Sequence, residues 1–377
     1  MAVSSSVFGD RHSLGLGARL LAVLKLDAPL LLALVTIAAF GLVVLWSAGG
    51  QEPGLLWRQL VRLGVAFGVM LVVAQVPPKM LRLWSPWLFA LGLALLVAVL
   101  LVGDVGKGAQ RWLDLGVIRF QPSELMKLAV PMMAAWYLHD RPLPPRLGEL
   151  ALLLVVVAVP AVLIARQPDL GTALLVASAG ILVVLLGGLR VRMILLLGAA
   201  AAVLAPVLWH FMHDYQRRRV LTFLQPESDP LGSGYHIIQS KIAIGSGGLF
   251  GKGWGNGSQA QLEFLPERST DFIFAVLGEE FGLLGLALLL VGYLVVVGRG
   301  LFIALQAQDT FSRLLAGSIS LTFFVYVFVN TGMVTGLLPV VGVPLPLVSY
   351  GGTSMVTLMA GFGMLMSIHG HRNLLAR

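Results

Sequence analysis

The feature that most constrains the fold is a run of 58 residues, Leu314–His371, that contains no Asp, Glu, Lys or Arg. A membrane-spanning helix needs roughly 20 mostly apolar residues, so two helices use only part of this run. The middle of the run, Gly336–Gly352, contains three prolines, which break a regular helix. Non-helical backbone at membrane depth is tolerated only where protein or a wet cavity surrounds it. We therefore expect two helices joined by a buried or re-entrant segment.

Eight further apolar runs precede this one and bring the expected number of membrane-spanning helices to about ten. They are Ala28–Gly50, Leu60–Val76, Leu88–Gly103, Ser123–His139, Leu150–Ala165, Leu170–Leu189, Met193–His213 and Phe281–Gly298. Only 12% of the 377 residues are charged, about half the share found in soluble proteins, which excludes a soluble fold. The sequence therefore predicts an all-α, polytopic integral membrane protein.

The helices are expected to form one membrane domain over residues 28–371, with a long extracytoplasmic loop, residues 214–270, between the seventh and eighth helices. Residues 1–27 are expected to be a cytoplasmic segment with an interfacial helix, and residues 372–377 a cytoplasmic tail. With both termini inside, 13 of the 26 Lys and Arg are cytoplasmic, and six of the others lie in the long loop, which carries little weight. The net charge of +8 thus bears on orientation and anionic lipids, and we expect no nucleic-acid partner.

Ionisable residues gather where the fourth helix is expected to begin on the outer side. Arg111 and Arg119 precede this helix, and Glu124 and Lys127 are three residues apart, so they share one helix face. Ionisable groups in a membrane span are costly and usually functional, although a simple ion pair at the helix start is the alternative. Ser123 is expected to cap this helix through its side chain.

Further polar residues lie in two other outer segments. Asp169 is expected at the start of the sixth helix, where the helix dipole favours an anion and structural capping is an equal alternative. In the long loop, apolar residues at near-helical spacing beside Lys241 predict a helix on the membrane surface; they are Tyr235, Ile238, Ile242 and Leu249. The glycines that follow, at positions 245–257, do not match a phosphate-binding loop, because Gly253 stands where Ser or Thr is needed.

Three carboxylates crowd the start of the eighth helix. Asp271 is expected in the first turn of this helix, and Glu279 and Glu280 are expected about two helical turns further along it. Like charges and partial desolvation raise the pKa of a carboxyl group, which suits a general base at neutral pH. The alternative is that Asp271 only stabilises the helix start through the dipole. The sequence contains no cysteine and no dedicated set of metal ligands.

Four long motifs resemble those of the SEDS family, the shape, elongation, division and sporulation proteins. They are Arg119–Lys127, Gln167–Thr172, Leu265–Glu280, and Asn330–Met333 together with Pro344–Gly352. The resemblance covers most of the chain, and residues Gly253–Leu262 resemble elongation members more than division members. Ser269 departs from the pattern, because many members carry His at that position.

The resemblance implies a peptidoglycan glycosyltransferase of the bacterial plasma membrane that polymerises lipid II at the outer face during cell elongation. It also implies a class B penicillin-binding protein as a partner, besides membrane lipids. Asp271 would be the catalytic base. The expected substrate-binding residues are Arg111, Arg119, Glu124, Lys127, Asp169, Lys241 and Glu280. A divalent cation, Mg²⁺ or Mn²⁺, is compatible with a pyrophosphate leaving group but is not required by the sequence.

Two other functions remain open at this point. A flippase for the same lipid would also have ten helices, a broken segment and buried charges, but it would move lipid without making polymer. A scaffold for the penicillin-binding protein would tolerate charge changes at Asp271 and Lys127 and lose function through changes on its helix surface.

Overall fold

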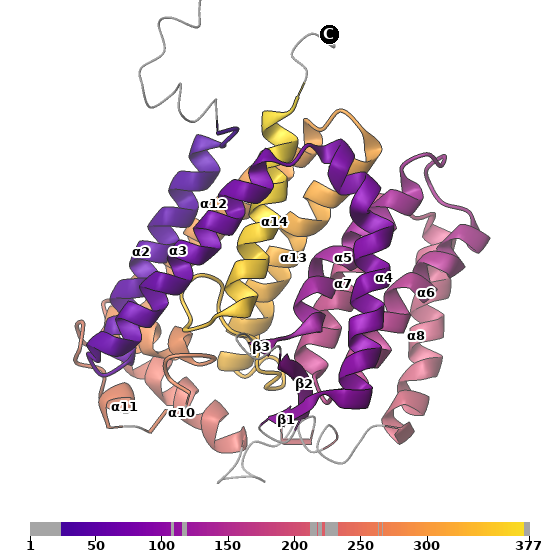
Figure 1. The fold of residues 1–377 in the computed structure, drawn as a ribbon. Coiled ribbons are helices and arrows are strands. Elements are labelled where there is room, and N and C mark those ends of the chain that lie inside the picture. The colour runs from indigo at the N-terminus through magenta and orange to yellow at the C-terminus, as the bar shows by residue number, and fades with distance from the viewer. Residues whose placement is uncertain are drawn as a thin grey trace, which may run out of the picture.

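The computed structural model describes residues 24–106, 109–114, 119–211, 217, 221–222, 233–262, 264–265 and 267–372. Its helices run side by side in one bundle (Figure 1). One end of the bundle, here called the terminal end, carries the start of α2 (Ala28–Ala48) and the end of α14 (Thr353–Gly370). The opposite end, here called the loop end, carries three short strands and the helices α10 (Ser233–Ser246) and α11 (Ser258–Gln261).

Each of the ten predicted apolar helices corresponds to a helix in the structure. Besides α2 and α14, they are α3 (Pro53–Gln75), α4 (Pro78–Val102), α5 (Pro122–Leu138), α6 (Leu147–Arg166), α7 (Leu170–Leu186), α8 (Val191–Phe211), α12 (Ile273–Leu305) and α13 (Thr310–Val334). Six of them, α2, α3, α4, α6, α12 and α13, are long and apolar enough to cross a membrane, and α7 is a shorter apolar helix. Large apolar side chains are exposed on their outer faces, as at Val72 (68%), Leu101 (77%) and Leu195 (68%). A multi-pass helical membrane protein is therefore confirmed, whereas the number of spans stays a prediction.

Three short antiparallel strands at the loop end were not predicted. They are β1 (Asp104–Gly106), β2 (Ala109–Asp114) and β3 (Arg119–Phe120), which pair in the order β1-β2-β3 between α4 and α5. The all-α prediction therefore holds for the bundle but not for this connection. The predicted interfacial helix in residues 1–27 and much of the long loop lie outside the described residues.

The centre of the bundle is packed with aromatic side chains from three helices. The rings of Tyr293 and Phe323 meet edge to face at 5.6 Å, and those of Phe323 and Phe362 at 5.0 Å. Edge-to-face contacts add about 0.5–1.5 kcal/mol beyond the burial of apolar area. They fasten α12, α13 and α14 to one another, and these are the helices that flank the segment between residues 335 and 352.

The segment 335–352 is a non-helical connection between α13 and α14, and it is buried over residues 345–349 whereas Leu337 is 72% exposed. Its backbone carbonyl groups accept hydrogen bonds from protein side chains: Tyr293 Oη donates to Pro346 O at 2.7 Å, and Gln59 Nε2 donates to Ser349 O at 3.2 Å. The helix α2 approaches so closely that a Cβ added to Gly41 would lie 2.7 Å from Leu347 O. Protein groups therefore satisfy this irregular backbone, as a membrane interior requires.

The glycine-rich segment before α11 completes a break in α12. Gly282, with φ 64° and ψ −162°, interrupts the helix. The loop 248–253 forms hydrogen bonds with the backbone groups that lose their helical partners at this break. Leu283 N donates to Gly248 O at 2.9 Å, and Gly253 N donates to Glu280 O at 3.0 Å. The approach excludes side chains, because a Cβ on Gly251 would lie 2.1 Å from Glu280 O. Backbone contact therefore explains Gly251 and Gly247, where an added Cβ would lie 2.0 Å from Gly278 O.

Candidate functional site

Asp271 lies at the loop end, just before α12, and is half-buried. Its position is fixed through the main chain by Asn330, a fully buried residue of α13. Asn330 Nδ2 donates to Asp271 O at 3.0 Å and to Val343 O at 2.7 Å. One amide group thus joins the residue before α12, the end of α13 and the connection that follows it.

The residues before Asp271 are bonded to the same connection. Ser349 Oγ donates to Thr270 O at 2.6 Å, and Tyr350 N donates to Ser269 O at 2.8 Å. Ser269 therefore contributes its backbone here, whatever its side chain does. Gly342, with φ 73°, lies beside the carboxylate, and a Cβ at that position would be 3.5 Å from Asp271 Oδ2. The connection thus lies against Asp271.

The motif containing Asp169 reaches that connection from another side. A Cβ on Gly171, in the first turn of α7, would lie 2.6 Å from Val341 O, so the two backbones touch. Asp169 caps α7, because Thr172 N donates to Asp169 Oδ1 at 3.2 Å, which confirms the predicted cap. Gly171 and Asp271 therefore both lie beside one short segment, Val341–Val343.

Arg111 and Gln121 bind Asp169 from the strand segment. Gln121 Nε2 donates to Asp169 Oδ2 at 3.0 Å, and the Arg111 guanidinium lies 3.9 Å from the same oxygen. Arg111 also donates to the carbonyl oxygens of Gln167 and Pro168. The contacts of Arg111 thus fix the link between α6 and α7, and the side chain of Arg119 lies outside the described residues.

Glu124 and Lys127 form the predicted pair within α5. Lys127 Nζ lies 2.7 Å from Glu124 Oε1, and both side chains are buried, with 6% and 7% of their area exposed. The ammonium also lies 5.4 Å from the centre of the Tyr326 ring. The prediction that Ser123 caps this helix is wrong: α5 begins at Pro122, and Ser123 Oγ is buried without a hydrogen-bond partner.

A cavity of about 30 Å³ opens beside Lys127, among α5, α13 and α14. This volume holds about two water molecules. Thr322 lines the cavity and its Oγ1 has no hydrogen-bond partner, and Glu124 Oε2 is also without one. Buried polar atoms normally find a partner, so these two oxygens are exceptions close to the ion pair.

Lys241 lies on α10 and reaches the connection between α13 and α14. A Cβ on Gly336 would lie 2.7 Å from Lys241 Nζ, and Ser240 Oγ donates to Val334 O at 2.7 Å. The side chain of Lys241 remains exposed. The predicted helix is therefore present; Ile237 and Ala243 are buried against the bundle, Ile242 is 45% exposed, and the position of the helix on the membrane surface stays a prediction. Leu249, assigned to it from spacing, lies beyond its end.

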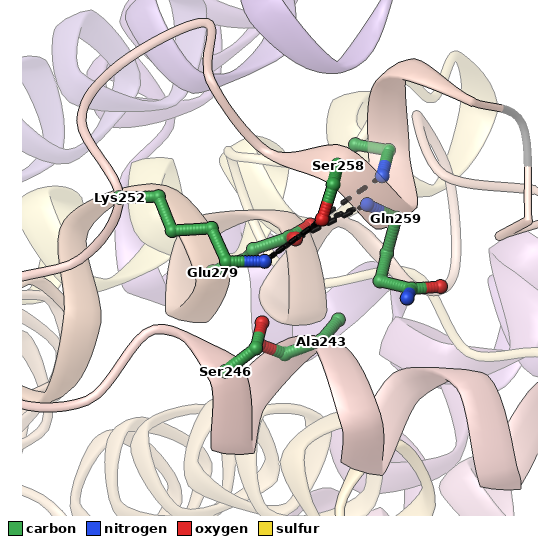
Figure 2. A network of polar contacts seen from close by, with 7 residues as sticks. Ala243, Ser246, Lys252, Ser258, Gln259 and Glu279 are labelled. Carbon is green, nitrogen blue, oxygen red and sulfur yellow. Dashed lines mark hydrogen bonds and ion pairs between the residues drawn. The ribbon is translucent and has the colours of Figure 1, made fainter.

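The carboxylates of Glu279 and Glu280 bind other parts of the protein, and Glu279 holds the glycine-rich loop that contains Lys252. Glu279 is fully buried and lies 2.6 Å from Lys252 Nζ, and it accepts hydrogen bonds from Ser258 Oγ at 3.0 Å and Gln259 N at 3.1 Å (Figure 2). Glu280, 1% exposed, accepts from Ser47 Oγ of α2 at 2.5 Å. These contacts give Glu280 a structural role, and its predicted contact with substrate stays untested.

Sequence reasoning did not assign roles to Asn330, Gln121 or Gly342, although two of them lie in motifs that carried the family resemblance. Their functions depend on contacts between distant segments: Asn330 with Asp271, and Gln121 with Asp169. Within the described part of the chain, no three His, Cys, Asp or Glu residues gather closely enough to hold a metal ion. The site thus offers the carboxylate of Asp271 beside the connection, with Lys241 beside Gly336 of the same connection.

The sequence was compared with protein families and with curated relatives. The profile of the FtsW/RodA/SpoVE family, described as cell cycle protein, matches residues 26–374. The peptidoglycan glycosyltransferase MrdB of Escherichia coli strain K12 is 55% identical over 353 residues, 93% of this chain and 95% of the relative. The probable peptidoglycan glycosyltransferase FtsW of Trichlorobacter lovleyi is 38% identical over 355 residues, 91% of this chain and 92% of the relative.

Solved structures show the same fold. The rod shape determining protein RodA of Thermus thermophilus superimposes with a TM-score of 0.70 at 31% identity, covering 92% of this chain and 98% of that one. A chain of a peptidoglycan synthase complex, studied for the structural coordination of polymerization and crosslinking, gives a TM-score of 0.79 at 37% identity. This match covers 91% of the present chain and 97% of that chain.

Proposed function

Because the chain belongs to the FtsW/RodA/SpoVE, or SEDS, family and is a peptidoglycan glycosyltransferase of the bacterial inner membrane, we propose that it polymerises lipid II with Asp271 as the general base. The observation that supports this best is the convergence of three family motifs on Val341–Val343, beside which Asp271 presents its carboxylate. The higher identity to MrdB, 55% against 38% for FtsW, supports a role in cell elongation.

The chemistry requires a base, because the acceptor hydroxyl of the sugar must lose a proton as it attacks the anomeric carbon of the donor. Inversion at that carbon needs the base on the face opposite the leaving group. Asp271 is half-buried and lies at the bundle end, so it can meet a sugar that enters from that side. Asn330 holds the carbonyl group of Asp271 and Ser349 holds that of the preceding Thr270, and such positioning keeps the carboxylate in place for attack.

Negative charge develops on the lipid pyrophosphate as it leaves, and cations stabilise this charge. Lys241 is the best placed of the predicted cations, because its ammonium is exposed and lies beside Gly336 on the connection that borders Asp271. Lys127 is buried with Glu124 and supports the bundle from within.

The orientation of the protein is also a proposal. Arginines gather at the terminal end, among them Arg146, Arg190, Arg192 and Arg313, and the positive-inside rule places this end in the cytoplasm. The loop end with Asp271 then faces the outside. The partner is proposed to be a class B penicillin-binding protein, because a structural neighbour comes from a complex that coordinates polymerization and crosslinking.

The decisive experiment measures glycan synthesis from lipid II by the purified protein together with its penicillin-binding partner. We expect Asp271→Asn to lower the rate at least 100-fold, since removal of a general base costs about 10²–10⁴ in rate. Glu52→Gln is the matched control, because Glu52 lies at the same end and forms only an exposed ion pair with Arg58. Near-normal polymer from Asp271→Asn would exclude the base.

The same preparation separates polymerase from flippase. Reconstitution in liposomes that contain labelled lipid II would show translocation without polymer if the protein were a flippase. The predicted outcome is polymer on the side of the loop end, with the yield abolished by Asp271→Asn and unchanged by Glu52→Gln.

A further inference from the structure

A second, separate cavity lies at the terminal end of the bundle, between the starts of α6 and α8. It has a volume of about 360 Å³ and is lined by Arg146, Arg190, Arg192, Leu147, Met193 and Leu196. This volume falls within the roughly 300–1,000 Å³ that is usual for small-molecule sites. Three of the six lining residues are arginines, and the other three are apolar.

The arginines of this cavity carry little compensating charge. Among the described residues, Arg190 and Arg192 form no ion pair. The nearby carboxylate of Glu149 is already bonded, because it lies 3.1 Å from the guanidinium of Arg141 and accepts from the backbone N–H of Arg146 at 2.8 Å. The cavity therefore keeps a positive charge that an anion can neutralise.

The remaining walls are those of a lipid-facing surface. Leu147 and Leu196 are 59% and 58% exposed, and Met193 forms a buried floor at 6%. Along α8 the adjacent residues Ile194 and Leu195 are also exposed, at 50% and 68%. Because the helix faces lipid, a molecule held by the arginines would extend its apolar part along these side chains.

We infer that this cavity binds the headgroup of an anionic phospholipid, with the phosphate between Arg190 and Arg192 and an acyl chain along Leu147 and Leu196. Planar guanidinium groups bind phosphate oxygens in pairs, and basic pockets between membrane helices hold anionic headgroups. A free phosphate would use the arginines but not the apolar walls. The site lies at the end opposite Asp271, so it is distinct from the proposed catalytic site.

The test is a titration of the purified full-length protein with dioleoylphosphatidylglycerol, followed by native mass spectrometry. A basic residue near an anionic lipid surface contributes about fivefold in affinity, so the double variant Arg190→Gln/Arg192→Gln should weaken binding about 30-fold. The matched control is Arg82→Gln/Arg313→Gln, which removes two arginines at the same end but outside the cavity. It should bind like the parent protein.

Two further arms identify the source of the phosphate. Dioleoylphosphatidylcholine should bind at least tenfold more weakly than phosphatidylglycerol, and inorganic phosphate should fail to displace bound phosphatidylglycerol. The inference is overturned if the double variant binds as the parent does, if the control loses as much affinity, or if phosphate alone displaces the lipid. Should the double variant fail to fold, the single variant Arg192→Gln must show the fivefold loss on its own.

Discussion

The strongest prediction concerns Asn330, which we expect to position Asp271 without touching substrate. The variant Asn330→Leu keeps the branch at Cγ and removes the amide that donates to Asp271 O at 3.0 Å and to Val343 O at 2.7 Å. Leaving a buried carbonyl without its donor costs about 1–3 kcal/mol, and two carbonyls lose their donor. We expect a total destabilisation of about 2–6 kcal/mol, together with a shift of the Asp271 backbone.

The expected kinetic effect follows from that shift. A displacement of about 1 Å at a reacting group costs about 10²-fold, so Asn330→Leu should lower kcat roughly 10- to 100-fold. KM for lipid II should change little, because Asn330 is fully buried and lies beside the backbone of Asp271. The assay is initial-rate glycan synthesis at several lipid II concentrations, with thermal unfolding measured in the same detergent.

Thr331→Val is the matched control. Thr331 is the next residue of α13, and its Oγ1 donates to Val327 O at 2.8 Å within the same helix. Its loss should leave both kcat and KM close to those of the parent protein. A normal kcat for correctly folded Asn330→Leu would refute the positioning role, as would an equal loss in Thr331→Val.

Two further predictions concern stability. Asp27 is buried against Arg299 at 2.6 Å; burial opposes ionisation, but the hydrogen bonds from Arg299 and from the backbone outweigh it and lower the pKa of Asp27. The stability that the Asp27 carboxylate provides is complete above its ordinary pKa and is lost as the pH falls through the lowered pKa. Asp27→Asn should therefore lower the free energy of unfolding by about 3 kcal/mol at pH 7 and by less in acid. Thermal unfolding at several pH values measures this difference. Gly251→Ala should destabilise by about 2–4 kcal/mol, because φ is +80° and the added Cβ would lie 2.1 Å from Glu280 O. Gly245→Ala, with open space around the added Cβ, should stay within about 1 kcal/mol of the parent, and equal melting temperatures for the two glycine variants would contradict the packing argument.

The helices of the bundle were predictable because each one corresponds to a single continuous apolar stretch of sequence of the length that a bilayer requires. The pair Glu124–Lys127 was predictable for the same reason, since a spacing of three residues places both on one helix face. The non-helical connection after α13 was also predictable, because prolines cannot continue a helix across the membrane.

The remaining features depend on contacts between distant parts of the chain. Nothing in the glycines near position 250 indicates that their partner is the broken backbone of α12, about 30 residues later. The sequence likewise does not show that Glu279 binds Lys252 whereas Asp271 stays half-buried at the bundle end. Spacing grouped these carboxylates together, and tertiary packing separated them into a structural role and a candidate catalytic role.

The pairing of the glycine-rich loop with α12 determines how this protein can be recombined with its relatives. Backbone groups in the first part of α12, which follows Asp271, form hydrogen bonds with residues 248–253. This part of the helix therefore depends on the loop for its backbone hydrogen bonding. A chimaera with a junction between residues 254 and 278 would join a loop from one parent to a helix from the other. Junctions placed before Gly247 and after Leu284 take both the loop and the first part of α12 from the same parent. A functional chimaera is therefore expected to receive these two segments together.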